Sequence, residues 1–165
     1  MSVASLPSGP PTVLDASLFD GPVLDGHALT TADVHDRRVA VLATGPLAVD
    51  VVPRVVAEAV LTKVFLLAPV RIVPPVPLVG ALASRPDLEA RLGRAYLRRE
   101  VRDKELRRKL TASDADAPVV VSGDYLATLQ SERCQVLAWP IVEVTARGIW
   151  TGDDLEHLVD VLVRA

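Results

Sequence analysis

The stretch Arg38-Val-Ala-Val-Leu-Ala-Thr-Gly-Pro-Leu-Ala-Val-Asp-Val-Val-Pro53 decides the fold. It begins with an unbroken apolar run over 39–43, which is typical of a strand buried on both faces of a parallel sheet. A turn centred on Gly45 follows. Apolar residues then recur at helical spacing, at Leu47, Val51, Val52, Val55, Val56 and Ala59. Strand, tight turn and helix in this order predict the first βα unit of a dinucleotide-binding, Rossmann-like domain.

The turn itself holds the candidate cofactor-binding residues. In such a unit, N–H groups at the start of the helix face a pyrophosphate, and glycines let the backbone approach it. Glycine is expected at the first, third and sixth positions of the turn, with alanine allowed at the last. These positions are Ala43, Gly45 and Ala48 here, so the first glycine is missing. Pro46 suits a helix start but removes one N–H donor, and Asp50 suits the helix dipole but repels a phosphate. The pattern therefore indicates a βα turn with an impaired phosphate site, formed by Ala43, Thr44, Gly45, Pro46, Leu47 and Ala48.

The second predicted strand, over 63–67, ends without a charged residue. An NAD site usually places Asp or Glu near this point, and an NADP site an arginine. This chain has Leu66, Leu67 and Ala68 there, and the nearest charge is Arg71. We include Arg71 among the candidate cofactor-binding residues, with a solvated loop arginine as the alternative.

Composition excludes several classes of function. The chain has 165 residues, half of them apolar, and a net charge of −3, so we expect one globular domain and no nucleic-acid partner. Its single cysteine, Cys134, excludes an internal disulfide and is expected to be an inert core thiol. Residues 1–11 lack the pattern of a signal peptide, and no apolar run reaches the roughly 18 residues of a membrane span. We therefore expect a cytoplasmic protein without a membrane partner.

The chain divides into two predicted parts. Residues 1–37, rich in Pro, Gly, Ser and Asp, are expected to form an extended N-terminal segment, with short strand pairing near 22–24. Residues 38–165 are expected to form the Rossmann-like domain. Within it, a proline-rich connector over 68–77 leads to a capping box, Ser84 to Asp87, that opens one long helical region through Leu110.

The C-terminal third has the pattern of strands. Apolar runs predict strands over 119–121, 134–138 and 159–163, with a helical turn over 124–130. Alternating residues predict an antiparallel hairpin with strands over 141–145 and 149–151. The predicted fold class is α/β, a Rossmann-like parallel sheet flanked by helices with an antiparallel β-hairpin near the C-terminus.

No combination of polar residues indicates catalysis or metal binding. His27 and His35 lack the spacing of metal ligands. Basic residues between 94 and 109 alternate with acidic ones, which indicates a salt-bridged, solvent-facing surface. Spacing alone does not bring the remaining candidates together, and they are assigned no role: Ser122, Asp124, Asp153, Asp154, Glu156, His157 and Asp160.

Several stretches keep a common order and spacing, namely 19–24, 38–53, 64–65 with Pro69, 104–111, 122–125, 127–130, 140–145 and 159–163. Together they resemble the NADPH-binding region of the flavin-dependent Baeyer–Villiger and related flavin-containing monooxygenases. The resemblance covers residues 19–165. It implies a region that lies after an FAD-binding unit and supplies NADPH to the flavin.

The departures from that family fall on positions that carry its chemistry. The family's first fingerprint glycine corresponds to Ala43, and its Arg-Thr pair for the 2′-phosphate corresponds to Leu67-Ala68. Its Lys-Arg pair, whose arginine assists oxygen chemistry, corresponds to Ala117-Pro118. The resemblance thus implies a truncated, non-catalytic binding or auxiliary protein. We expect no tightly bound cofactor in this chain alone, weak NADPH binding at most, and FAD only through a partner.

Two alternatives stay open. In the first alternative, the chain is the NADPH-binding piece of a split FAD-dependent monooxygenase and is active only with a separate FAD-binding chain. In the second it folds without a selected role, which the intact apolar periodicity disfavours. Because the family's domain packs against its FAD domain, we expect exposed apolar surface here and a homodimer or a hetero-partner.

Overall fold

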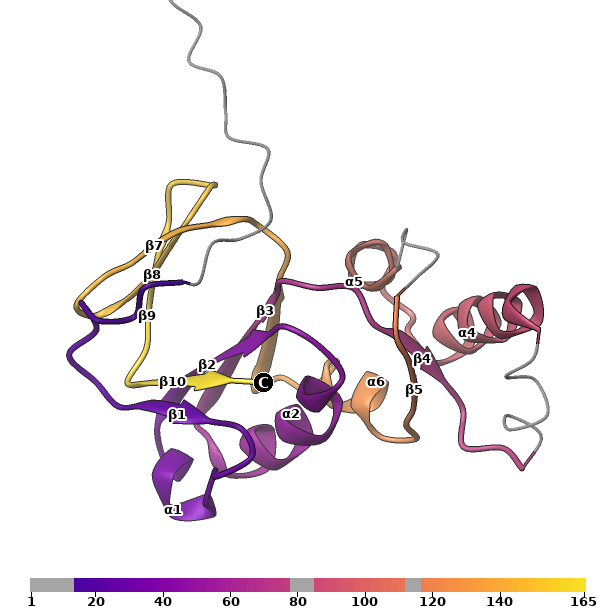
Figure 1. Ribbon diagram of the computed structural model, residues 1–165, viewed down its shortest axis with the longest axis horizontal. Coiled ribbons are helices and arrows are strands. Elements are labelled where there is room, and N and C mark those ends of the chain that lie inside the picture. The colour runs from indigo at the N-terminus through magenta and orange to yellow at the C-terminus, as the bar shows by residue number, and fades with distance from the viewer. Residues whose placement is uncertain (1–13, 78–84, 112–116) are drawn as a thin grey trace, which may run out of the picture.

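A five-stranded parallel sheet forms the centre of the computed structural model, which describes residues 14–77, 85–111 and 117–165 (Figure 1). The strand order is β1-β10-β2-β3-β6, and every neighbouring pair is parallel. The middle strand, β2, is the predicted one: its residues 39–43 are all less than 5% exposed. The predicted parallel sheet is confirmed, with strands β1 Val23–Asp25, β2 Arg38–Ala43, β3 Leu61–Leu66, β6 Cys134–Leu137 and β10 Val161–Arg164.

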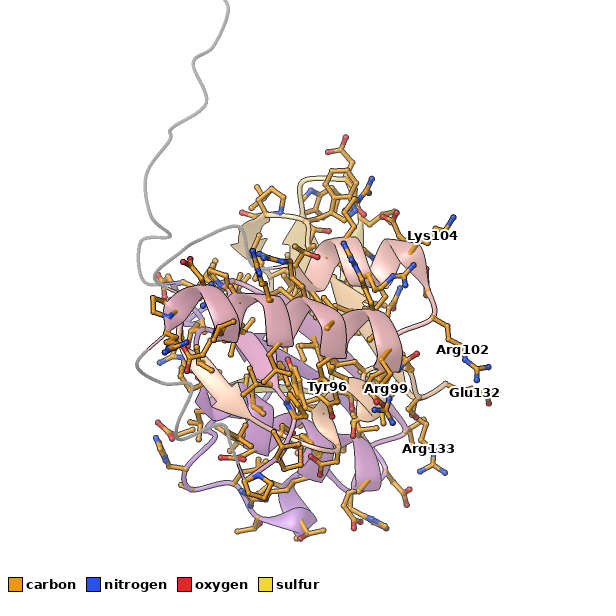
Figure 2. All side chains as sticks on the ribbon, turned by 90° about the vertical axis from the view of Figure 1, so that its right-hand side faces the viewer. Tyr96, Arg99, Arg102, Lys104, Glu132 and Arg133 are labelled. Carbon is orange, nitrogen blue, oxygen red and sulfur yellow. The ribbon has the colours of Figure 1, made fainter. Side chains whose placement is uncertain are left out.

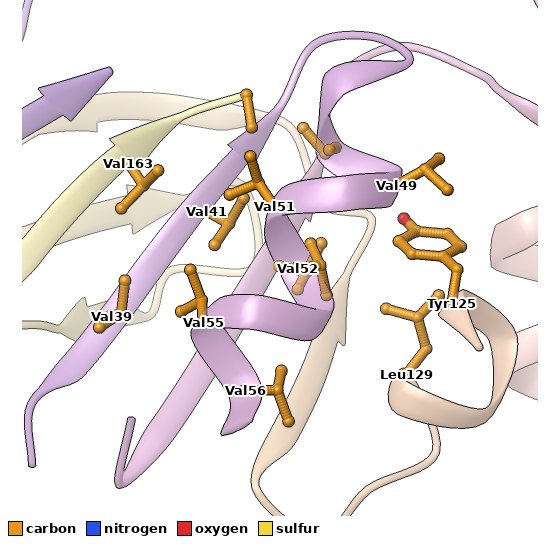
Figure 3. Packing of buried hydrophobic residues seen from close by; sticks show 14 of the residues in the cluster. Val39, Val41, Val49, Val51, Val52, Val55, Val56, Tyr125, Leu129 and Val163 are labelled. Carbon is orange, nitrogen blue, oxygen red and sulfur yellow. The ribbon is translucent and has the colours of Figure 1, made fainter. Parts of the chain in front are cut away.

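Each face of this sheet is covered by a different layer. Val39, Val41 and Val163 point to the face covered by α2 (Leu47–Glu58), where Val51 and Val55 meet them (Figure 3). Alternate residues of β2, β3 and β10, among them Ala40, Leu42, Phe65 and Leu162, lie in a second cluster on the opposite face. Because side chains alternate along a strand, a continuous apolar run is required to fill both layers.

Helix α2 continues through Pro53, which sits in its interior. A proline there lacks an N–H and removes one intrahelical hydrogen bond, at a cost of roughly 3 kcal/mol. Val51, Val52 and Val55 are each completely buried, and such burial contributes roughly 1.5–3 kcal/mol per side chain. The apolar stripe therefore outweighs the local cost, and the predicted helix forms over its full length.

The second face of the central sheet is covered by an antiparallel sheet. The predicted hairpin is confirmed as β7 (Ile141–Val144) and β8 (Gly148–Thr151), and a third strand, β9 (Glu156–Leu158), pairs with β8. Sequence analysis missed β9, since it is three residues long and follows a turn with two aspartates. Val144 and Ile149 turn inward from this sheet towards Phe65.

A smaller unit lies beside the carboxyl edge of the central sheet, on the right in Figure 1. It contains a two-stranded parallel sheet, β4 (Arg71–Val73) with β5 (Val119–Val121), so part of the predicted connector is a strand. Helix α4 (Pro86–Glu100) packs on β4, followed by α5 (Lys104–Leu110) and the short α6 (Tyr125–Thr128). This unit forms one wall of the candidate site.

The single long helix predicted up to Leu110 is wrong, because α4 and α5 are separate. Val101 leaves the helix and is completely buried, and Asp103 accepts a hydrogen bond from the N–H of Glu105, which starts α5. The predicted cap Ser84 lies outside the described residues, and Arg85 occupies the N-cap position. Tertiary burial of Val101 thus interrupts a pattern that reads as continuous helix.

The described part of the predicted N-terminal segment, residues 14–37, contributes to the domain, and residues 1–13 lie outside the described residues. Strand β1 lies near the expected pairing site and pairs with β10, and a short helix, α1 (Thr31–Val34), follows it. The last strand, β10, begins at Val161, since Val159 and Asp160 turn the chain out of β9.

Replacing Gly148 by alanine should destabilise the protein by roughly 1–3 kcal/mol or more. A Cβ at this position would lie 2.1 Å from the backbone oxygen of His157, so β8 and β9 would have to separate. The matched control is Gly45→Ala, whose Cβ would meet no atom within 4 Å and whose effect should stay within about 0.5 kcal/mol. Urea denaturation measures both, and equal stability of the two variants would contradict the packing.

Replacing Asp160 by asparagine should reduce the pH dependence of stability in acid. The guanidinium of Arg38 holds the pKa of Asp160 below its ordinary value through hydrogen bonds of 2.6 and 3.0 Å, and the Arg38 N–H adds a third at 2.8 Å. The stabilisation is present above the unfolded pKa of about 3.9 and is lost as the pH falls through the lower folded pKa. Urea unfolding between about pH 5 and pH 2 should show that the free energy of unfolding falls less steeply for Asp160→Asn than for the wild type. Parallel curves for the two proteins would count against this prediction.

Candidate functional site

A pocket of about 220 Å³ opens where β2 and β3 end. Its other walls are the first turn of α2 and the unit formed by β4, α4 and α5. In open α/β sheets, ligands bind outside the carboxyl ends of the strands. The topology therefore places this pocket where a dinucleotide-type domain holds its ligand.

The structure brings four of the seven predicted cofactor-binding residues to this pocket, namely Ala43, Gly45, Ala48 and Arg71. The other three, Thr44, Pro46 and Leu47, do not line it. The pocket wall is extended by residues at the end of β3, where Leu66, Leu67 and Ala68 give an apolar surface.

Several hydrogen-bond donors at the turn and the start of α2 are already engaged within the chain. The N–H and the hydroxyl of Thr44 both donate to the carbonyl oxygen of Ala165, at 2.6 and 2.9 Å. The N–H of Ala48 donates to Gly45 at 3.3 Å, and that of Val49 donates to Pro46 at 3.1 Å. Pro46 has no N–H. A pyrophosphate at this turn would therefore find few of the backbone donors that such ligands require.

Gly45 keeps an open approach to its backbone. A Cβ there would meet no atom within 4 Å. Its backbone is thus accessible from the pocket, as the third fingerprint position requires. At the first position, Ala43 is only 4% exposed and its methyl group joins the core below the pocket.

Three cationic side chains line the pocket, Arg71 on β4, Arg94 on α4 and Lys109 on α5. Lys109 is half-buried, and its Nζ donates to the carbonyl oxygen of Val136 at 3.1 Å. Among the described residues that form the pocket, none is Asp or Glu. Three positive charges around an apolar floor favour an anionic ligand.

Gly93 allows α4 to approach β4 closely enough to form this wall. A Cβ on Gly93 would lie 3.1 Å from Cγ of Arg71 and 3.3 Å from the carbonyl oxygen of Ile72. The aliphatic part of Arg71 therefore packs directly on the α4 backbone. Sequence analysis assigned the 94–109 cations to a solvent face and missed Arg94 and Lys109. The signal available was Gly93, since a glycine inside a helix often marks close packing.

Tyr125 completes the floor of the pocket. Its side chain is 4% exposed, and its hydroxyl oxygen points towards the first turn of α2, near Val49 (Figure 3). Burial, with a smaller contribution from Cys134, raises the pKa of Tyr125 to about 12, so the phenol is protonated at neutral pH and can donate a hydrogen bond.

Other polar candidates do not form a second site in the described part of the chain. Ser122 donates to Asp124 at 3.0 Å within one turn, and Asp160 pairs with Arg38. His157 contacts the hydroxyl of Thr151, and this hydroxyl donates a hydrogen bond to Asp153. Burial lowers the pKa of His157. The described residues contain no group of three His, Cys, Asp or Glu side chains suited to a metal ion.

The thiol of Cys134 is also outside the pocket. Burial raises the pKa of Cys134 to about 12, which keeps the thiol protonated at neutral pH. Of the helices that the structure describes, none has both the length and the apolar character needed to cross a bilayer.

Comparison with known proteins finds relatives among monooxygenases. No family model matches the chain. A phenazine N-monooxygenase, PhzNO1 of Lysobacter antibioticus, is 38% identical over 76 residues, which are 44% of this chain and 14% of that protein. The cyclohexanone monooxygenase from Rhodococcus sp. Phi1 bound to NADP⁺ superposes with a TM-score of 0.75 at 20% identity, covering 94% of this chain and 43% of that one.

A steroid monooxygenase bound to NADP also superposes on this chain, with a TM-score of 0.77 at 16% identity, covering 96% of this chain and 44% of that one. The chain thus spans less than half the length of the monooxygenases that it matches. The resemblance drawn from the sequence is confirmed: the chain has the α/β fold of part of the flavin-dependent monooxygenases.

Proposed function

We propose that this chain is a monooxygenase-type nucleotide domain that acts as a non-catalytic binding protein. One observation carries the proposal. The pocket at the carboxyl edge of the sheet is open and cationic, whereas the βα turn beside it has lost its phosphate-binding capacity, since Thr44 donates to Ala165, Pro46 has no N–H, and Ala43 replaces the first glycine.

The loss has a predictable effect on NADPH affinity. A hydrogen bond to a charged group contributes roughly 1.5–3 kcal/mol, so each lost phosphate contact weakens binding by about 10- to 100-fold. The resemblance assigns an arginine and a threonine to the positions of Leu67 and Ala68, and both residues here are uncharged. Weak NADPH binding by this chain is therefore part of the proposal.

Redox chemistry would have to come from outside the described residues. Amino-acid side chains neither accept a hydride nor activate oxygen, and a flavin supplies that chemistry in flavoenzymes. The position of the family's catalytic arginine is occupied here by Pro118, whose carbonyl oxygen accepts a hydrogen bond from the N–H of Arg71 at 2.8 Å. If the chain is one piece of a split monooxygenase, turnover will appear only together with a separate FAD-binding chain.

Restoring the arginine should restore NADPH affinity. Leu67 lines the pocket at the end of β3, so Leu67→Arg places a guanidinium where a 2′-phosphate is recognised in NADP sites. We expect about tenfold tighter NADPH binding than in the wild type, with NADH unchanged, in calorimetric titrations. The wild type with added FAD should oxidise no NADPH.

The control is Leu18→Arg, the same substitution at an exposed leucine that does not line the pocket, which should leave both affinities unchanged. Two results would contradict the proposal. They are steady NADPH oxidation by the wild-type chain with FAD, and wild-type NADPH binding as tight as that of Leu67→Arg.

A protein partner is the second element of the proposal. Large apolar side chains are exposed on and beside the antiparallel sheet: Trp139 by 53%, Val142 by 62% and Leu155 by 55%. Exposed apolar surface of this kind favours association. Sedimentation velocity at rising concentration should show a dimer that Val142→Lys weakens, since a charge would then be desolvated at the contact. A sedimentation coefficient that stays at the monomer value would count against self-association.

A further inference from the structure

We infer that the pocket binds a compact organic carboxylate with an apolar body, held by Arg94, Lys109 and Tyr125. This inference rests on the proposed function, because it names the ligand of a site that no longer serves as a full dinucleotide cradle. Four features of the pocket lead to it: its size, its charge, its apolar floor and its buried phenol.

The volume of the pocket and the shortage of free hydrogen-bond donors at the turn disfavour a dinucleotide. Pockets that enclose drug-sized ligands measure roughly 300–1,000 Å³, and this one measures about 220 Å³. The turn that would hold a pyrophosphate has its Thr44 donors committed to Ala165. The remaining space lies between the end of β3 and the α4–α5 wall, which suits a smaller ligand.

The positive charges of the pocket and its apolar floor together favour an amphipathic anion as the ligand. Arg71, Arg94 and Lys109 approach the pocket from three different elements, and the described residues around it include no acid. Between these cations the floor is apolar, formed by Ala48, Leu66, Leu97, Leu110 and Leu126. A ligand with one anionic end and an apolar body satisfies both parts, whereas a free phosphate would leave the apolar floor uncovered.

The phenol of Tyr125 supplies the pocket with a neutral hydrogen-bond donor beside the cations. The side chain of Tyr125 is 4% exposed and lines the pocket. Its high pKa keeps the proton in place, so it can donate to a carboxylate oxygen in the same pocket.

Two neighbouring residues offer matched controls on the same helices. Arg98 lies on α4 four residues after Arg94, and Lys104 is the first residue of α5; neither lines the pocket. Figure 2 shows Lys104 extending into solvent away from the sheet. Arg98→Gln and Lys104→Gln therefore remove the same charges as Arg94→Gln and Lys109→Gln without touching the pocket.

The test is calorimetric titration of the full chain with 2-naphthoate and with its neutral isostere 2-naphthamide. We expect saturable one-to-one binding of 2-naphthoate and at least tenfold weaker binding of the amide, since the two share an apolar body and differ in charge. Arg94→Gln and Lys109→Gln should each weaken 2-naphthoate about three- to tenfold, while Arg98→Gln and Lys104→Gln change it less than twofold.

Tyr125→Phe separates a ligand role from a structural one. Phenylalanine keeps the buried ring, so the melting temperature of the free protein should change little. The same change should weaken 2-naphthoate about threefold and the amide less. A lower melting temperature with unchanged 2-naphthoate affinity would assign the phenol a purely structural role and overturn its part in the inference.

Three results would overturn the carboxylate assignment: no saturable binding of 2-naphthoate by the wild type, equal affinity for the amide, or tighter binding of pyrophosphate than of 2-naphthoate. The amide comparison uses the unmodified protein, so a variant that fails to fold does not decide the outcome. NADPH turnover with FAD would instead refute the non-catalytic function. The two failures are therefore distinguishable.

Discussion

The structure depends on the burial of β2 on both faces and along both edges. Its five residues after Arg38 are less than 5% exposed, hydrogen-bonded to β10 on one side and β3 on the other. Alternate side chains enter the two hydrophobic clusters, one under α2 and one under the antiparallel sheet. Because every neighbour packs against this strand, its end fixes where the turn, the first helix and the pocket can lie.

The same constraint separates the framework of this domain from its ligand chemistry. Core residues such as Val41 and Val55 are held by packing, and a polar substitution there would cost about 2–7 kcal/mol of stability. Leu67 and Ala68, after the end of β3, face the pocket and carry no such constraint. These two positions could therefore differ from the expected nucleotide-binding residues while the fold stayed intact.

The pocket wall is built by close packing of α4 and by the break between α4 and α5. Gly93 brings α4 onto β4, which places Arg94 beside the pocket, and the break at Val101 turns α5 so that Lys109 reaches the end of β6. Neither cation belongs to the βα turn. The positive charge of Arg94 and Lys109 thus reaches the pocket from α4 and α5.

The sequence by itself determined the elements whose signal is local. The apolar run of β2, the stripe of α2 and the hairpin of β7 and β8 follow from periodicity, and the ordered stretches identified the monooxygenase fold. Only the tertiary structure decided the rest. It split the predicted long helix at Val101, added β9, and gathered Arg71, Arg94, Lys109 and Tyr125 around one pocket. The reason is physical: these residues lie on four elements far apart in the chain, and no spacing rule joins side chains that meet only through packing.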